Sequence, residues 1–221
     1  MDKGRAEAFS DGVLAVAITL LVLDLHVAAT GSGSLSHQLA HNWPSFAAYI
    51  VSFFVIGVIW VNHHALFGLV DRVDRVLLFE NLILLMFVTT LPFTTSTLAE
   101  FVREGGANAR WAVVLYGISN IGMALAFTVM LSRMVHHGLL ANPVAPDVAR
   151  RAVRRFGLGS IAYPAATAAG LLWPPLILIA IAVLAVYYMA EQTQILPKAD
   201  HADHADHADH ADPGGLTAEE S

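Results

Sequence analysis

Long apolar stretches separated by short polar segments dominate the chain. Six of them are candidate membrane helices, because about 20 apolar residues are needed to cross ~30 Å of hydrocarbon. Transmembrane strands would instead show weaker alternation over segments of about ten residues. The pattern therefore predicts an all-α integral membrane protein with six transmembrane helices. The predicted spans are Phe9–Ala29, Pro44–Val70, Val76–Leu98, Trp111–Met134, Phe156–Trp173 and Leu176–Ala190.

Composition and charge divide the chain into two parts. Of its 221 residues, 56% are hydrophobic and 14% are charged, whereas a soluble domain carries about 25% charged residues. The absence of cysteine excludes a disulfide framework, a thiolate metal site and a cysteine nucleophile. The formal net charge is -6, yet eight acids and only one lysine lie from Glu191 onward. We expect a nearly neutral membrane domain, residues 1–195, and an acidic tail, residues 196–221.

The tail repeats Ala-Asp-His from Ala199 to Asp212. No residue of the repeat is apolar and larger than alanine, so the repeat cannot bury a core, and we expect it to be disordered. Its histidines could bind a divalent metal weakly or buffer protons near pH 6.5, and the sequence leaves both alternatives open.

Basic residues predict the orientation of the spans. Cytoplasmic loops of membrane proteins are enriched in Lys and Arg, and ten of the twelve basic residues lie on one side if both termini are cytoplasmic. The first span is not expected to be a cleaved signal peptide, because Glu7 and Asp11 stand beside its basic residues. The segment Gly31–Asn42 is then an external loop. The longest internal loop, between Met134 and Phe156, carries arginines that we expect at the lipid headgroups.

The first span contains carboxylates close to membrane depth. Asp11 and Asp24 enclose twelve uncharged residues, which as a helix cover only about 18 Å. At least one carboxylate therefore lies near the hydrocarbon, unless the helix is tilted and both lie in the headgroup zone. Ionisable groups in the hydrocarbon are functional candidates because they must face protein or water.

The predicted topology also brings polar residues of the first three spans to one depth at the inner end. Buried polar groups must bond one another, so we expect a network that locks the first helix to the next two. A metal site is the alternative, but His63 and His64 are adjacent and point about 100° apart, unlike the i, i+4 histidines of helical zinc sites. We therefore expect no metal and no other cofactor. The residues concerned are Arg5, Ser10, Asp11, Trp60, Asn62, His63, His64, Glu80 and Asn81.

An apolar stripe follows one face of the first span. Val16, Leu20 and Leu23 are spaced i, i+4, i+7, with Thr19 at the edge of the stripe. Such stripes usually face lipid or another helix, and a pore lining is the alternative. Beyond the stripe, Asp24 lies at the outer end, where an acidic mouth would concentrate cations or where the helix end is simply exposed.

A short motif at the start of the first span resembles a known family. Arg5-Ala-Glu-Ala-Phe9-Ser10-Asp11 matches the RxxxFSD signature of the transmembrane protein 175 family, endolysosomal potassium channels with bacterial relatives. The stretch from Gly12 to Leu25 resembles the first helix of the bacterial members, and Trp60-Val-Asn-His63-His64 resembles the end of their second helix. The resemblance covers all six spans in order.

The resemblance implies a homotetramer in which the first helix of each subunit lines a central pore, and it implies a channel rather than an enzyme. The family's hydrophobic constriction maps onto Val16, Leu20 and Leu23, and its ion-selectivity layer maps onto Thr19. Asp24 would lie at the pore mouth. The expected function is a potassium-favouring cation leak channel in the bacterial inner membrane, in contact with lipid and with no nucleic-acid partner. The signature network comprises Arg5, Phe9, Ser10, Asp11, Trp60, Asn62, His63, His64 and Asn81.

A proton-coupled secondary transporter is the competing class, with Asp11 and the histidines as a proton relay. Such transporters usually contain internal repeats and broken helices at the midplane. The sequence shows no clear repeat, although Pro92 and Pro164 could break two of the spans. Ohmic cation current would favour the channel, and saturable, gradient-coupled solute uptake would favour the transporter.

Overall fold

Helices make up almost all of the computed structural model, which describes residues 2–25, 34–141 and 145–191. The predicted acidic tail and the end of the first predicted span, from His26 to Ala29, lie outside the described residues. Within the described residues, the only β pairing is an isolated antiparallel bridge between Val70 and Leu140. The predicted all-α class is confirmed. The elements are α1 (Lys3–Leu20), η1 (Leu21–Asp24), α2 (Leu35–His41), α3 (Trp43–Gly68), α4 (Arg75–Phe101), α5 (Gly106–His136), α6 (Pro146–Gly157), α7 (Gly159–Leu172) and α8 (Pro175–Glu191).

Four helical segments are long and apolar enough to cross a membrane, judged by length and composition alone. They are Lys3–Asp24, Trp43–Gly68, Arg75–Phe101 and Gly106–His136. The last two predicted spans form shorter helices, of 14 residues in α7 and 17 residues in α8. The described chain thus contains four full-length candidate spans and a shorter helical hairpin.

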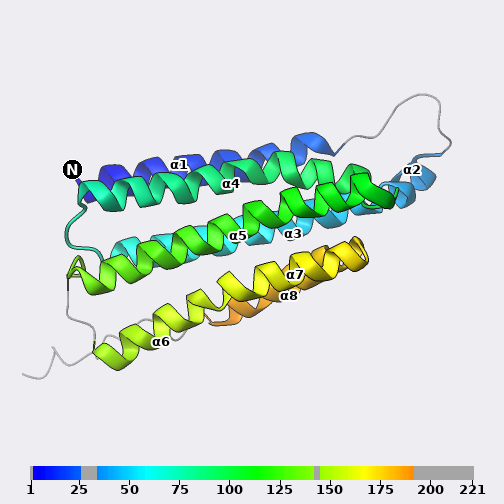
Figure 1. Ribbon diagram of the computed structural model, residues 1–221. Coiled ribbons are helices and arrows are strands. Elements are labelled where there is room, and N and C mark those ends of the chain that lie inside the picture. The colour runs from blue at the N-terminus through cyan, green and yellow to red at the C-terminus, as the bar shows by residue number, and fades with distance from the viewer. Residues whose placement is uncertain (1, 26–33, 142–144, 192–221) are drawn as a thin grey trace, which may run out of the picture.

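The long helices run side by side in alternating directions (Figure 1). α4 contacts α1, α3 and α5, while α5 also contacts α7, and α8 closes the bundle against α3. Two glycines of α5 permit close approach, because small residues let helix backbones pack tightly in membranes. A Cβ atom on Gly122 would lie 2.2 Å from the ring of Phe87 in α4, and one on Gly117 would lie 2.3 Å from Thr167 in α7.

Hydroxyl groups join α3, α4 and α5 in the half of the bundle that contains η1. The hydroxyl of Ser52 lies 2.7 Å from that of Thr95 and 2.9 Å from that of Tyr116, and all three side chains are buried. In hydrocarbon no water is available to satisfy such groups, so they bond one another. These contacts fix the two helices beside which α1 lies.

Two predicted loops contain helices. In the external segment, α2 begins after Ser34, whose side chain accepts the backbone N–H of His37. In the predicted internal loop, α6 forms because its apolar residues recur at i, i+3, i+4 and i+7 and pack against the bundle. These residues are Ala149, Ala152, Val153 and Phe156.

Candidate functional site

The first helix has one buried face and one open face. Ala6, Ser10, Leu14 and Ala17 are buried against α3 and α4. The opposite face is exposed along its whole length, since no described segment of the chain covers it. Between Arg5 and Leu23 the exposed positions are Arg5, Ala8, Phe9, Gly12, Ala15, Val16, Thr19, Leu20, Val22 and Leu23.

The predicted stripe lies on this open face. Val16 is 57% exposed, Leu20 43% and Leu23 64%. The 3-10 turn of η1 brings residues i and i+3 nearly into line, which aligns Leu23 with Leu20. The rise from Val16 to Leu20 is about 6 Å at 1.5 Å per α-helical residue. From Leu20 to Leu23 it is also about 6 Å, at 2.0 Å per 3-10 residue, so the three side chains are evenly spaced.

Thr19 lies between these apolar side chains and is exposed. Its hydroxyl donates to the carbonyl of Val16 at 2.8 Å. The donor is therefore used within the helix, while the lone pairs of the hydroxyl oxygen remain available as acceptors on the open face. This geometry presents an oxygen ligand among apolar groups.

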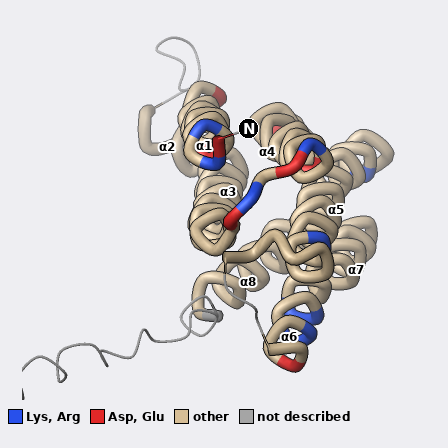
Figure 2. Tube along the Cα trace, turned by 90° about the vertical axis from the view of Figure 1, so that its left-hand side faces the viewer, with Lys and Arg blue, Asp and Glu red and all other residues tan. Residues whose placement is uncertain are grey.

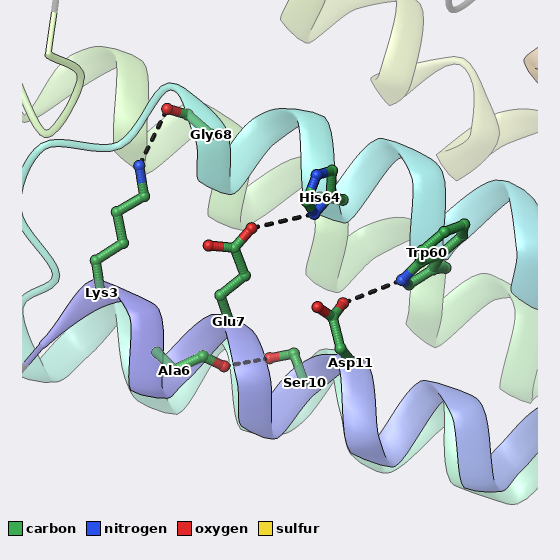
Figure 3. Close-up of polar contacts among 8 residues, drawn as sticks. All are labelled: Lys3, Ala6, Glu7, Ser10, Asp11, Trp60, His64 and Gly68. Carbon is green, nitrogen blue, oxygen red and sulfur yellow. Dashed lines mark hydrogen bonds and ion pairs between the residues drawn. The ribbon is translucent and has the colours of Figure 1, made fainter.

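Polar contacts, one per helical turn, tie the N-terminal half of α1 to α3 like the rungs of a ladder (Figure 3). Lys3 donates to the carbonyl of Gly68 at 3.0 Å, Glu7 pairs with His64 at 3.1 Å, and Asp11 accepts the indole N–H of Trp60 at 3.0 Å. The partners are four residues apart on each helix, and the two helices run in opposite directions. The rungs therefore repeat once per turn along one contact line. Glu7 and Lys3 were not among the predicted site residues, although their spacing with Asp11 carried the signal.

A second, buried network joins α1, α3 and α4. Asn81 donates to the hydroxyl of Ser10 at 2.8 Å and accepts from Nε2 of His63 at 2.9 Å. Ser10 itself donates to the carbonyl of Ala6 at 2.9 Å. The ring of His63 also stacks on Phe67, with centroids 4.3 Å apart. This buried triad brings together three of the predicted residues.

Other predicted members lie apart from the triad. Asn62 is buried and donates to the carbonyl of Val58 within α3. Arg5 and Phe9 lie on the open face of α1, and Arg5 makes no ion pair or hydrogen bond to any described residue. Asp11 bonds Trp60 rather than Arg5. The predicted Arg–Asp–His–Asn network is therefore divided between the rungs and the triad.

Glu80 faces α5 and not α1. Its carboxylate forms an ion pair with Nε of Arg133 at 3.8 Å, while Nη2 of Arg133 donates to Asp74 at 2.6 Å. Asp74 caps α4 by accepting the N–H of Leu77 at 2.8 Å. The bond from Leu77, followed by the one from Arg133, lowers the pKa of Asp74 below its ordinary value. Sequence reasoning missed this cluster, although Asp before an apolar run is a helix-start signal.

The C-terminal end of η1, which continues α1, borders an open pocket of about 630 Å³. Asp24 lines it together with Glu100 and Glu104 from α4 and the following turn, and Arg103 there donates to the carbonyl of His41. Thr95 and Ser96 of α4 also line this pocket, whereas Thr94 is buried and bonds Ser119 of α5. The charged lining carries three acids and one arginine, which makes this mouth electronegative.

Within residues 2–25, 34–141 and 145–191, no group of three His, Asp or Glu side chains is placed to hold a metal ion. The polar residues instead hold α1 against α3 and α4 and leave its apolar face open.

Comparison with known proteins identifies the family. The family described as "Endosomal/lysosomal potassium channel TMEM175" matches residues 5–92. "Potassium channel B446_29190" of Streptomyces collinus is 47% identical over 196 residues, covering 88% of this chain and 95% of the relative. The chain belongs to the TMEM175 family.

Other members share the sequence and the fold. "Potassium channel Cha6605_3372" of Chamaesiphon minutus is 40% identical over 153 residues, covering 68% of this chain and 72% of that protein. The crystal structure of a lysosomal potassium-selective channel TMEM175 homolog from Chamaesiphon minutus matches with a TM-score of 0.73 and 34% identity, covering 85% of this chain and 96% of that chain. This TMEM175-family chain is therefore a membrane protein with the channel fold of its family.

Proposed function

We propose that this chain is a potassium-favouring cation leak channel, in which four copies place the open face of α1 around a central pore. The observation that carries the proposal is the exposure of Val16, Leu20 and Leu23 along a helix whose opposite face is anchored by polar contacts. Lipid alone would not require such anchoring. The potassium channel names of the relatives from Streptomyces collinus and Chamaesiphon minutus support potassium as the permeant ion.

Three apolar rings in series would form the constriction. Rings of apolar side chains gate by excluding water, and their spacing of about one helical turn makes the narrow region about 12 Å long. Acceptor oxygens of Thr19 would replace part of the water that a cation sheds between the rings. Asp24 at the electronegative mouth would concentrate cations there.

The remaining elements complete the assembly in this proposal. α7 and α8 serve as the fifth and sixth spans, although they are short, and both termini lie on the cytoplasmic side of a bacterial plasma membrane. Figure 2, which views the bundle from this end, shows Lys and Arg positions on α1, α5 and α6 and on the segment that leads into α4, and the positive-inside rule supports this side as the cytoplasmic one. Arg5 and Phe9 would meet neighbouring subunits at the inner entrance.

The test is passive cation flux through purified protein in liposomes, with potassium and sodium compared under an imposed diffusion potential. Flux that is faster for potassium and needs no cosubstrate supports the proposal. Saturable solute uptake driven by a proton gradient would instead establish the transporter.

Leu23→Ala tests the constriction directly. Because the substitution widens one ring, we expect about a tenfold rise in flux, equivalent to about 1.4 kcal/mol of barrier. Ile179→Ala is the matched control, since Ile179 is an exposed apolar residue of α8, away from α1. Unchanged flux in Leu23→Ala, with assembly intact, removes Leu23 from the pore lining.

A further inference from the structure

The most basic surface of the described chain lies on α6. Its four arginines and one aspartate give it three net positive charges. Because the apolar face of α6 packs on the bundle, with Phe156 against Phe127 at 5.0 Å between ring centroids, the arginines are directed outward. Arg151 pairs with Asp147. Arg150 and Arg154 are exposed and make no ion pair or side-chain hydrogen bond to any described residue.

The last turn of α8 lies beside the last turn of α6. The ring of Tyr188 stacks on that of Phe156 with centroids 6.2 Å apart, and its hydroxyl lies 3.5 Å from the carbonyl of Arg155. The chain therefore leaves α8 next to the arginines. Residues 192–221 carry seven acids and one lysine, five of the acids within the Ala-Asp-His repeat.

We propose that the acidic repeat, residues 199–212, docks on the arginine face of α6 in the same subunit. Eight residues from Glu191 to Ala199 span up to about 26 Å when extended, and α6 is about 18 Å long, so the repeat reaches every arginine. Tethering gives an effective concentration in the millimolar range, which lets several weak ion pairs hold together.

Lipid headgroups are the competing occupant of this face. A helix that binds a lipid surface lies in the plane of the interface, whereas α6 runs along the bundle in continuation of α7 (Figure 1). Figure 2 shows Lys and Arg positions along α6, at the lower edge of the view. This orientation favours the acidic repeat, which would approach from the cytoplasm, over lipid headgroups in the plane of the membrane.

The test uses the full chain, whose lack of cysteine permits specific spin labelling. Labels are attached at Val148→Cys on α6 and Ala211→Cys in the repeat, and labelled chains are diluted with unlabelled chains in phosphatidylcholine nanodiscs. A docked repeat gives a narrow distance component within about 18 Å, the length of α6. A free 20-residue segment gives a broad distribution with a root-mean-square span of about 25 Å.

Charge variants decide the origin of that component. Arg150→Gln/Arg154→Gln should lower the ratio of docked to free repeat by about fivefold. The matched control Arg72→Gln/Arg75→Gln, on the same side of the membrane but away from α6, should leave it unchanged. Neutralising the tail with Asp203→Asn/Asp206→Asn/Asp209→Asn should lower this ratio at least as much, and this second variant leaves the membrane domain intact. One molar salt, with a Debye length of about 3 Å, should do the same.

Two results would overturn the proposal. The first is a narrow component that survives both sets of charge variants. The second is a broad distribution in phosphatidylcholine, together with immobilisation of the α6 label by phosphatidylglycerol in the native chain but not in Arg150→Gln/Arg154→Gln. That second result would assign the arginine face to lipid headgroups.

Discussion

Asn81→Leu is the sharpest test of how α1 is held. The substitution removes the bonds of Asn81 to His63 and Ser10, at 2.9 and 2.8 Å. Hydrogen bonds between membrane helices contribute about 0.6 kcal/mol each. Ser10 keeps its bond to the carbonyl of Ala6, but Nε2 of His63 is left buried without a partner, which costs a further ~1–3 kcal/mol. We expect a loss of about 2–4 kcal/mol in the free energy of unfolding.

A double variant separates the stranded ring from the lost bonds. In Asn81→Leu/His63→Phe no polar group is left without a partner, and the new phenyl ring can stack on Phe67 as the histidine does. Replacing both partners of a buried hydrogen bond by apolar groups of similar shape is nearly neutral. The double variant should therefore recover most of the stability lost in the single one.

The assay is unfolding in mixed detergent micelles, followed by fluorescence of the four tryptophans, with assembly checked by gel filtration. Asp11→Ala is the comparison at the exposed rung, because Trp60 is 44% exposed and water can replace its partner. It should cost less than about 1 kcal/mol. Equal losses in Asn81→Leu and in the double variant, or a larger loss in Asp11→Ala than in Asn81→Leu, would refute this account of the buried triad.

Two further predictions concern the packing and the inner end of the bundle. Gly122→Ala should destabilise the fold by about 1–3 kcal/mol through overpacking against Phe87. Gly57→Ala, whose added Cβ has no neighbour within 4 Å, should leave the unfolding midpoint unchanged or raise it. Asp74→Asn keeps a good capping residue but loses the charge beside Arg133, so it should cost only ~0.2–1 kcal/mol near pH 7. Since the folded-state pKa of Asp74 is lowered, the native chain holds this stability above about pH 4 and loses it as pH falls further. The free energies of unfolding of the native chain and of Asp74→Asn are then measured as a function of pH. A difference between them that stays constant from pH 7 to below pH 4 would contradict that assignment.

Sequence pattern predicted the long helices well because a membrane requires long apolar segments. α4 and α5 cover the third and fourth predicted spans and extend a few residues beyond them, and α3 matches the second predicted span except that it ends at Gly68, two residues early. α6 was assigned to a loop because its arginines masked the apolar spacing from Ala149 to Phe156. The tetramer and the six-span count stay predictions, since the contacts between subunits lie outside a single chain.

Residue types and depth predicted which polar groups share the inner end, but not how they pair. Neighbouring residues on a helix point about 100° apart. His63 therefore meets Asn81 of α4 while His64 meets Glu7 of α1, and Asn81 faces α1 while Glu80 faces Arg133. Arg5 lies one position from buried Ala6 and is turned to the open face. The rotation of each helix about its axis decides these partners. Apolar residues surround these helices on most sides, so the sequence pattern specifies that rotation poorly.

The rungs between α1 and α3 also fix the position of α1 along the bundle axis. Apolar helix surfaces in lipid slide past one another at little cost, because lipid tails are as apolar as leucine. The side chains of Val16, Leu20 and Leu23 repeat about every 6 Å. If α1 shifted by one turn along its axis, each side chain would therefore move to the height that the next one had occupied. Lys3, Glu7 and Asp11 form three rungs in the observed alignment and would lose this matched set after such a slip. The three rungs thus fix the position of α1 along α3, although its apolar side chains alone would allow several equivalent positions.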